Sequence, residues 1–261
     1  MRKLGDRILK VYVVFFFAVL FGPIIMMVIY SFNSINSFGV FGGLSIKWYS
    51  TLVSNPDIQT AIYNSITVAL AATSLAAAVA VLSAFAVSRF SFTGRPALSM
   101  AFMIPIIIPE IAESVTFLIF MIWTGLQVYA GWVTVVMAHV VWFPLVYVVV
   151  RARLSGFDRS VEDAARVLGA DEVQTFLRIT MPLLLPGIVA GSLLMFTWSW
   201  DSLIKTSFTK GPGFNTLPIY IWAKIGGRRM GATPELNALA TLSILLSVLL
   251  AILYARSVAK R

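Results

Sequence analysis

Residues 160–182 read SVEDAARVLGADEVQTFLRITMP and form the polar centre of the chain, between two long apolar runs. Ser160 and the acidic residues after it fit a capping box, in which the Ser160 hydroxyl accepts a hydrogen bond from the Asp163 amide. Gly169 is expected to take the left-handed conformation that ends this first helix. Asp171 is suited to cap a second helix that leads into the next apolar run. The sequence therefore predicts two short helices joined at a glycine.

Apolar runs on both sides of this segment are long enough to cross a membrane. A spanning helix needs about 20 mostly apolar residues. Of the 261 residues, 59% are hydrophobic and 12% are charged, and the mean hydropathy is +0.89. The runs that meet the length requirement lie at about Val11–Tyr30, Ala61–Val87, Ala97–Trp123, Gly131–Val150, Leu183–Leu203 and Leu236–Ala255. The chain is therefore predicted to be an all-α membrane protein with six transmembrane helices.

The distribution of lysine and arginine predicts the orientation of these spans. With both termini in the cytoplasm, the inner segments hold 14 of the 20 basic residues, as the positive-inside rule favours. The first span lacks a small-residue cleavage site, so we interpret it as a retained anchor. We divide the chain into the first span with its outer connection (1–60), a five-helix core (61–256) that includes the cytoplasmic segment 151–182, and a cytoplasmic tail (257–261).

The composition excludes several classes of function. Without cysteine, the chain cannot form a disulfide, a thiol nucleophile or a cysteine-ligated metal site. The dipeptide Gly-Lys does not occur, so there is no Walker-type phosphate loop, and any ATP chemistry must belong to a partner. The net charge of +9 fits basic cytoplasmic loops better than nucleic-acid binding. We therefore expect no catalytic residue, no metal and no cofactor on this chain.

The order of residues in the polar segment resembles the Glu-Ala-Ala loop of inner-membrane permeases of ATP-binding-cassette importers. In that family the pattern is Glu-Ala-Ala, three residues, Gly, nine residues, and then Ile-x-Leu-Pro. The matching positions in this chain are Asp163, Ala164, Ala165, Gly169, Ile179, Met181 and Pro182. Asp163 stands where the family has Glu, with Glu162 directly before it, and Met181 stands where it has Leu. Small alanines permit close approach of a helix to a groove, and Gly169 can fix the angle between the two helices.

This resemblance implies a type I importer permease fold, in which the segment is a coupling helix that docks in a groove of an ATPase subunit. The residues assigned to coupling are Glu162, Asp163, Ala164, Ala165, Gly169, Ile179 and Pro182. The resemblance also implies partners: a paralogous permease, two ATPase subunits that bind ATP and Mg, and an extracytoplasmic solute-binding protein. It implies a location in a bacterial cytoplasmic (inner) membrane.

Similarity outside the coupling segment points to one branch of the family, the second permease subunit of spermidine/putrescine importers. It extends from about Leu44 to the C-terminus and depends on several short stretches. These are Leu44–Tyr49, Asn55-Pro56, Asn64-Ser65, Gly211–Gly213, Thr216–Tyr220 and Pro234–Leu239. The branch implies import of a polyamine by alternating access, and another small solute of the same importer class is the alternative.

The third predicted span contains two carboxylates and two prolines. Glu110 and Glu113 lie three residues apart on one helical face near the middle of the bilayer, where a charge costs roughly 2.5–3.5 kcal/mol. Pro105 and Pro109 each remove a backbone donor and are expected to kink or break the helix. We assign both carboxylates to the substrate pathway. The alternative is that they cap a helix that restarts after Pro109, or pair with polar groups of a neighbouring subunit.

The end of the fifth span contains the other two residues that we assign to the substrate pathway. Trp198 and Asp201 share a helical face and would offer a cation both an aromatic ring and a carboxylate. Two alternatives stay open: Lys205 could neutralise Asp201, and Trp198 and Trp200 could form an interfacial belt. His139 is the single histidine of the sequence, so we expect it to be packed and hydrogen-bonded.

Two classes of transport protein compete at this point. One is a permease subunit of an ATP-driven importer, and the other is a self-sufficient secondary carrier that uses Glu110, Glu113 and Asp201 for ion coupling. The spacing of the coupling segment favours the importer. Three acidic groups along one predicted pathway favour a small cation as the solute, and a polyamine is such a cation.

Overall fold

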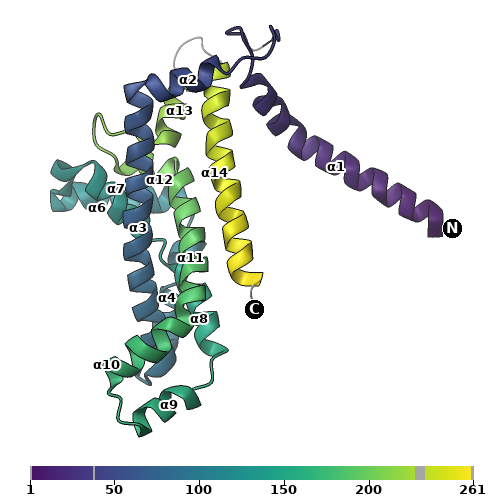
Figure 1. Cartoon of the computed structure of the whole chain (residues 1–261). Coiled ribbons are helices and arrows are strands. Elements are labelled where there is room, and N and C mark those ends of the chain that lie inside the picture. Colours follow the sequence, from purple (N-terminus) through teal and green to yellow (C-terminus); the bar gives the residue numbers. More distant parts are fainter. Residues whose placement is uncertain (1, 38, 227–232, 260–261) are drawn as a thin grey trace. The chain divides into compact units, whose positions relative to one another are not determined.

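The computed structural model describes residues 2–37, 39–226 and 233–259, and every regular element in these ranges is a helix (Figure 1). Four of the basic residues counted for orientation, Arg228, Arg229, Lys260 and Arg261, lie outside the described residues. Long helices satisfy most of their own backbone hydrogen bonds, which is what a bilayer requires of a spanning segment.

Five stretches of the described chain are long and apolar enough to cross a membrane. They are Leu9–Tyr30 in α1 (Arg2–Tyr30), α3 (Pro56–Arg89), Trp132–Ser155, Glu172–Asp201, and Pro234–Arg256 in α14 (Pro234–Ala259). Two of these stretches are composite: Trp132–Ser155 consists of α7 (Trp132–Val140) and α8 (Pro144–Ser155), and Glu172–Asp201 consists of α10 (Glu172–Thr175), the π-helical turn η2 (Phe176–Thr180) and α11 (Met181–Asp201). These stretches confirm five of the predicted spans.

The remaining predicted span, 97–123, is broken. It consists of α4 (Arg95–Ala101), α5 (Ile104–Ile107) and α6 (Glu110–Thr124), and the direction of the chain turns by 104° between α5 and α6. Ile108 is extended, with ψ 136°, because a residue before proline avoids the helical region, and Pro109 then precedes α6. The break expected at the prolines is confirmed, and the bent pair gives a sixth span if it is counted as one.

The described chain forms two compact units. The first comprises Met1–Gln59 and Tyr220–Leu246, with α1, α2 (Lys47–Ser54), most of α13 (Leu217–Gly226) and the first half of α14. Asn33 organises the connection that follows α1. Its side-chain amide donates to the carbonyls of Ser37 and Val40 at 3.0 and 2.8 Å, and its Oδ1 accepts from the Gly42 amide at 2.8 Å. This connection is therefore a structured loop.

The second unit, Thr60–Ile219 with Ser247–Arg261, contains a core formed by α3, α7, α8 and α11. The face of α3 in this core is a row of buried alanines at four-residue spacing: Ala72, Ala76, Ala80 and Ala84. Small side chains let neighbouring helices approach closely in a membrane. On α11, a Cβ atom at Gly191 would lie only 2.9 Å from the Cα of Val146 on α8. The two helices therefore pack backbone to backbone at this glycine.

Three further elements of this unit, η1 (Leu126–Tyr129), α9 (Ser160–Val167) and α12 (Ile204–Thr209), complete the fold. Within this unit, α9 and α10 lie together near the C-terminal end of α3. Helices α6, α7 and α12 lie nearer the middle of α3 (Figure 1). The residues predicted for coupling and those predicted for the substrate pathway therefore lie in two separate regions of this unit.

Candidate coupling segment and membrane cavity

The first helix of the coupling segment, α9, does not begin as predicted. The Ser160 hydroxyl makes no capping bond; instead, Oδ1 of Asp158 accepts a hydrogen bond from the Ser160 amide at 3.0 Å. The Asp163 amide donates to the carbonyl of Arg159, also at 3.0 Å. The capping box predicted at Ser160 is wrong because Asp158, a strong capping residue just before α9, bonds to the Ser160 amide, and the Asp163 amide is taken by a backbone carbonyl. The hydrogen bonds from Ser160 hold the pKa of the exposed Asp158 carboxyl below its usual range.

The turn after α9 follows the prediction. Gly169 has φ +90°, in the left-handed region. Asp171 caps α10, because its side chain accepts a hydrogen bond from the Gln174 amide at 2.7 Å. Just before the turn, the side chains of Val167 and Leu168 are 87% and 88% exposed. Neither residue was predicted to have a role, and their signal in the sequence is only that two apolar residues precede the glycine of a polar segment.

Glu162 faces the interior and joins three elements. It is 2% exposed, and Arg89 at the end of α3 approaches it with Nε 2.8 Å from Oε2 and Nη2 3.1 Å from Oε1. The Thr180 hydroxyl donates to the same Oε1 at 2.8 Å. Thr180 is the last residue of the π-helical turn η2, so one carboxylate joins α9, α3 and the start of α11. We name Arg89, Glu162 and Thr180 the Glu162 clamp.

Asp163, the neighbour of Glu162, faces outward instead. It is exposed and pairs with Arg166 at 2.9 Å, and Arg166 also pairs with Glu172 of α10 at 3.1 Å. These exposed pairs hold α9 and α10 together at the surface and contribute little stability, because water screens them. Of the two acidic residues assigned to coupling, Asp163 is therefore the one available to a partner.

The other predicted coupling residues are distributed over the surface and the start of α11. Ala164 is exposed and Ala165 is half-buried, so a surface of small side chains lies beside the acidic residue of α9. Ile179 is half-buried in η2, and Pro182 is exposed in the first turn of α11. A proline is tolerated there because the first helical amides have no partner within the helix.

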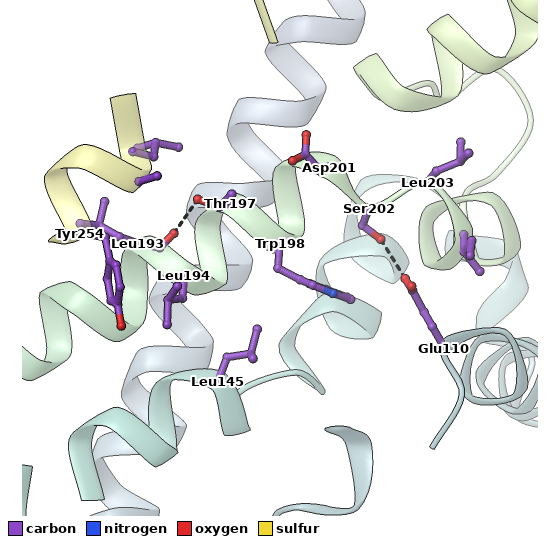
Figure 2. A pocket seen from close by; sticks show the side chains of 13 residues that line it. Glu110, Leu145, Leu193, Leu194, Thr197, Trp198, Asp201, Ser202, Leu203 and Tyr254 are labelled. Atoms are coloured by element: carbon purple, nitrogen blue, oxygen red, sulfur yellow. Dashed lines mark hydrogen bonds between the residues drawn. The ribbon is translucent and has the colours of Figure 1, made fainter. Parts of the chain in front are cut away.

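A cavity of about 640 Å³ lies among α6, α8, α11 and the C-terminal part of α14 (Figure 2). Glu110, Trp198 and Asp201 line it, together with Ser202, Tyr254 and mostly aliphatic side chains. The Ser202 hydroxyl donates to Oε1 of Glu110 at 3.4 Å, as Figure 2 shows. The structure thus brings three of the four predicted pathway residues to one cavity, and two of the three are acidic.

The two carboxylates of the third span lie directly after the break that the prolines were predicted to cause. Glu110 and Glu113 are both in the first turn of α6, directly after the break at Pro109. The positive end of the helix dipole stabilises negative charge in this turn. Helix α6 does restart at these residues, as the alternative proposed, while their place near the middle of the bilayer stays a prediction.

Asp201 and Lys205 do not form the ion pair that was considered as an alternative. Asp201 is exposed and its Oδ2 lies 3.5 Å from the Ser247 hydroxyl of α14. The Lys205 ammonium instead lies 2.8 Å from Oε2 of Glu113. Glu113 therefore has a polar partner within its own chain.

The Lys205 side chain lies in a small enclosure with one carboxylate and two indole rings. It is 1% exposed, and its ammonium lies 5.4 Å from the centroid of the Trp142 ring and 5.3 Å from that of Trp198. The two rings stack on each other, with centroids 4.3 Å apart and 12° between their planes. Trp142 Nε1 donates to Oε2 of Glu113 at 2.8 Å. We name Glu113, Trp142 and Trp198 the ammonium cage; no local sequence pattern points to Trp142.

His139 has the packed role expected for it. It is fully buried, with Nδ1 2.7 Å from the Ser199 hydroxyl and Nε2 3.1 Å from the Thr206 hydroxyl. Trp200 is 4% exposed, so an interfacial belt position for it is wrong. Among the described ranges, no three His, Asp or Glu side chains gather as a metal site would require.

Comparison with known proteins identifies the family of this architecture. Residues 76–261 match the family model described as binding-protein-dependent transport system inner membrane component. The chain is 37% identical over 234 residues to the putrescine transport system permease protein PotI of Escherichia coli, covering 87% of this chain and 82% of PotI. It is 38% identical over 239 residues to the spermidine/putrescine transport system permease protein PotC of Haemophilus influenzae, covering 91% of each chain.

A solved structure shows the same fold. A chain of a bacterial ABC transporter involved in the import of the acidic polysaccharide alginate superimposes with a TM-score of 0.78 at 16% identity, covering 97% of this chain and 96% of that one. In importers of this kind, the multi-pass permease works with a binding protein, a paired permease and a separate ATPase subunit. The match over residues 76–261 and the identity to two permeases across most of their length show that this chain belongs to the family of binding-protein-dependent transport system inner membrane components.

Proposed function

We propose that this chain is the permease subunit of an importer that carries polyamines by alternating access. The observation that carries the proposal is the identity of 34–38% to permeases of putrescine and spermidine/putrescine systems, over 87–91% of this chain. The cavity supports the same solute class, because Glu110 and Asp201 supply negative charge and Trp198 supplies a ring face for a cationic amine.

A second solute class deserves a test because one relative suggests it. The chain is 33% identical over 66% of its length to a probable molybdenum ABC transporter permease of Haloferax volcanii. If that solute were an oxyanion such as molybdate, the two carboxylates in the cavity would repel it. The charge of the cavity therefore favours the amine over the oxyanion.

The proposal assigns the cytoplasmic segment to coupling with the ATPase. Val167 and Leu168 are suited to enter an apolar groove, since both side chains are almost fully exposed. Asp163 and Ala164, exposed on α9, are suited to the rim of that contact. Gly169 sets the direction of α10 relative to α9, and its φ of +90° excludes a bulky β-branched residue.

The proposal also includes the finer assembly and topology. The paired permease is a paralogue, two ATPase subunits bind the coupling segments, and both termini are cytoplasmic. The core of residues 61–256 carries the pathway, and the span before it is an added anchor. Because the chain has no cysteine, a Val167→Cys variant tests the orientation: an impermeant thiol reagent should leave it unmodified in intact cells and label it in inverted vesicles.

Reconstitution with the ATPase, the paired permease and the binding protein tests the function. Uptake of radiolabelled putrescine and spermidine should require ATP and should stop with vanadate, while molybdate should not be carried. A self-sufficient carrier would instead transport without the ATPase and respond to an ionophore. Uptake of an unrelated solute, with no uptake of either polyamine, would reject the solute assignment and leave the family assignment intact.

A further inference from the structure

The ammonium cage contains a primary alkylammonium group that belongs to the protein itself. The side chain of Lys205 is a four-carbon chain that ends in an ammonium, and it is 1% exposed. Its ammonium lies 2.8 Å from a carboxylate oxygen of Glu113 and within 5.4 Å of the centroids of two indole rings. A carboxylate combined with aromatic faces is the chemistry by which proteins recognise cationic amines. The cage is therefore shaped and charged for a primary ammonium.

The cage shares a wall with the cavity. The Trp198 ring lines the cavity of about 640 Å³ and also lies 5.3 Å from the Lys205 ammonium. Glu110, which lines the cavity, lies one helical turn before Glu113 in α6. Only the Trp198 ring would therefore separate an alkylammonium in the cavity from the cage.

Glu113 retains unused capacity to accept a hydrogen bond. Its Oε2 receives both the Lys205 ammonium and the Trp142 indole, whereas its Oε1 is buried without a hydrogen-bond partner among the described residues. A buried carboxylate oxygen normally has a partner, since leaving it unpaired costs free energy. This oxygen is therefore available to a donor that the free protein lacks.

We propose that the ammonium cage is a second amine station of the transport pathway, which Lys205 occupies in this conformation and which the ammonium of the transported amine takes when Lys205 leaves. The inference rests on the proposed function for the solute class. In the resting protein, Lys205 neutralises Glu113, so no uncompensated charge is buried. During transport, the returning Lys205 competes with the solute and prevents the station from holding it too firmly, as a pathway requires.

A different result is expected if Lys205 and Glu113 form an ion pair with a purely structural role. Replacing the lysine of a structural pair only destabilises the protein, because Glu113 loses its partner. Under the proposal, the emptied cage gains the ability to bind a free amine. The Lys205→Ala variant separates the two, because alanine lacks the three outer carbons and the ammonium, and n-propylammonium has this size and charge.

The experiment uses the assembled complex of permeases and ATPase with Lys205→Ala. n-Propylammonium should raise the melting temperature of this variant and change its tryptophan fluorescence, whereas n-propanol, a neutral molecule of the same size, should do neither. Lys205→Ala/Glu113→Gln should lose the response because the carboxylate is gone, and Lys205→Met should lose it because methionine fills the cage. Lys210→Ala is the matched control, since Lys210 contacts Asn215 outside the cage.

Putrescine then connects the cage to transport. The Lys205→Ala complex, without binding protein, should bind putrescine about tenfold more tightly than the unaltered complex and release it more slowly. Equal stabilisation by n-propanol, an unchanged response in the Lys205→Ala/Glu113→Gln variant, or equal putrescine affinity in the two complexes would overturn the proposal. If Lys205→Ala fails to assemble, recovery by n-propylammonium but not n-propanol supports the proposal, and no recovery overturns it.

The n-propylammonium experiment does not depend on which solute the importer carries. If the unaltered importer carries no polyamine, the proposed function fails while this experiment still reports on the cage. If the importer carries putrescine but the emptied cage ignores n-propylammonium, the cage proposal alone fails.

Discussion

The second unit of the chain contains two buried ion pairs of the same charge type, and they differ in how fully their carboxylates are used. In the Glu162 clamp, both carboxylate oxygens have a partner: Oε1 accepts hydrogen bonds from Arg89 Nη2 and from the Thr180 hydroxyl, and Oε2 lies 2.8 Å from Arg89 Nε in an ion pair. In the ammonium cage, Oε2 of Glu113 takes both donors and Oε1 takes none among the described residues. We therefore call the clamp the saturated joint, because both of its carboxylate oxygens have a partner. We call the cage the unsaturated site, because one of its carboxylate oxygens has none among the described residues.

The chemistry of each cation matches this difference. The planar guanidinium of Arg89 binds two oxygens at once and fixes the geometry of the carboxylate. The ammonium of Lys205 is a point charge on a flexible chain, which can leave and return without rearranging a fork of hydrogen bonds. An arginine therefore suits the joint between α9 and α3, and a lysine suits a site beside a cavity.

The largest effect is expected from breaking the saturated joint. Arg89→Met should leave Glu162 buried and unpaired, which costs about 3–5 kcal/mol in comparable cases. The contact between α9 and the membrane helices should loosen, so the ATPase should continue to hydrolyse ATP while transport falls. The measurement is the ratio of ATP hydrolysed to solute carried in proteoliposomes with matched assembly.

Two further variants make this prediction specific to the clamp. Arg89→Glu/Glu162→Arg restores opposite charges and should recover part of the coupling, which no loss of bulk packing could explain. Arg178→Met removes an exposed arginine from the same segment and should leave the ratio unchanged. A normal ratio in assembled Arg89→Met complexes would show that the clamp transmits nothing.

A smaller effect is expected when each carboxylate loses one neutral donor. Thr180→Val removes the hydroxyl from Glu162, and Trp142→Phe removes the indole N–H from Glu113 but keeps a ring against Trp198. Hydrogen bonds to charged groups contribute about 1.5–3 kcal/mol. Thr180→Val should raise the ATP-to-solute ratio, whereas Trp142→Phe should change the transport rate at an unaltered ratio. The same response of both variants would contradict the distinction between joint and site.

Neutralising the cavity carboxylates should lower the transport rate without changing the stability of the protein. Glu110→Gln and Asp201→Asn keep shape and remove charge, so both should lower polyamine uptake several-fold and leave solute affinity of the binding protein unchanged. Asp57→Asn, an exposed acid in the first turn of α3, is the matched control. If both cavity variants carry polyamines at the normal rate, the cavity does not attract the solute by charge.

Much of the fold could be predicted from the sequence because the relevant signals are local. Five spans follow from the length of their apolar runs, and the break in the third span follows from Pro105 and Pro109. The turn at Gly169 and the cap at Asp171 follow from residue preferences within a few positions. The capping box predicted at Ser160 is wrong for a reason that is also local: Asp158 bonds to the amide at the start of the same helix.

The pairings in the two buried sites could not be predicted, because their members come from distant parts of the chain. Arg89 and Glu162 are separated by 73 positions, and the sequence offers several other basic residues on the same predicted side. Lys205 lies one helical turn after Asp201, so local spacing favoured the wrong partner, and only the bend before α6 brings Glu113 to it. The roles of the assigned coupling and pathway residues stay predictions.

The smallest effect is expected at Asp158, the exposed carboxyl near the Glu162 clamp. Its pKa is lower than the usual 3.8 because the folded state donates hydrogen bonds from Ser160 to the charged form. The contribution to the stability of α9 is therefore complete above this usual value and is lost as the pH falls through the lower folded value. In Asp158→Ala, hydrogen exchange at the first amides of α9 should be faster at neutral pH, and the difference from the unaltered chain should shrink toward acid pH. Because water screens this group, coupling should remain close to normal. An uncoupled Asp158→Ala complex would show that the start of α9, and not the saturated joint, holds the segment in place.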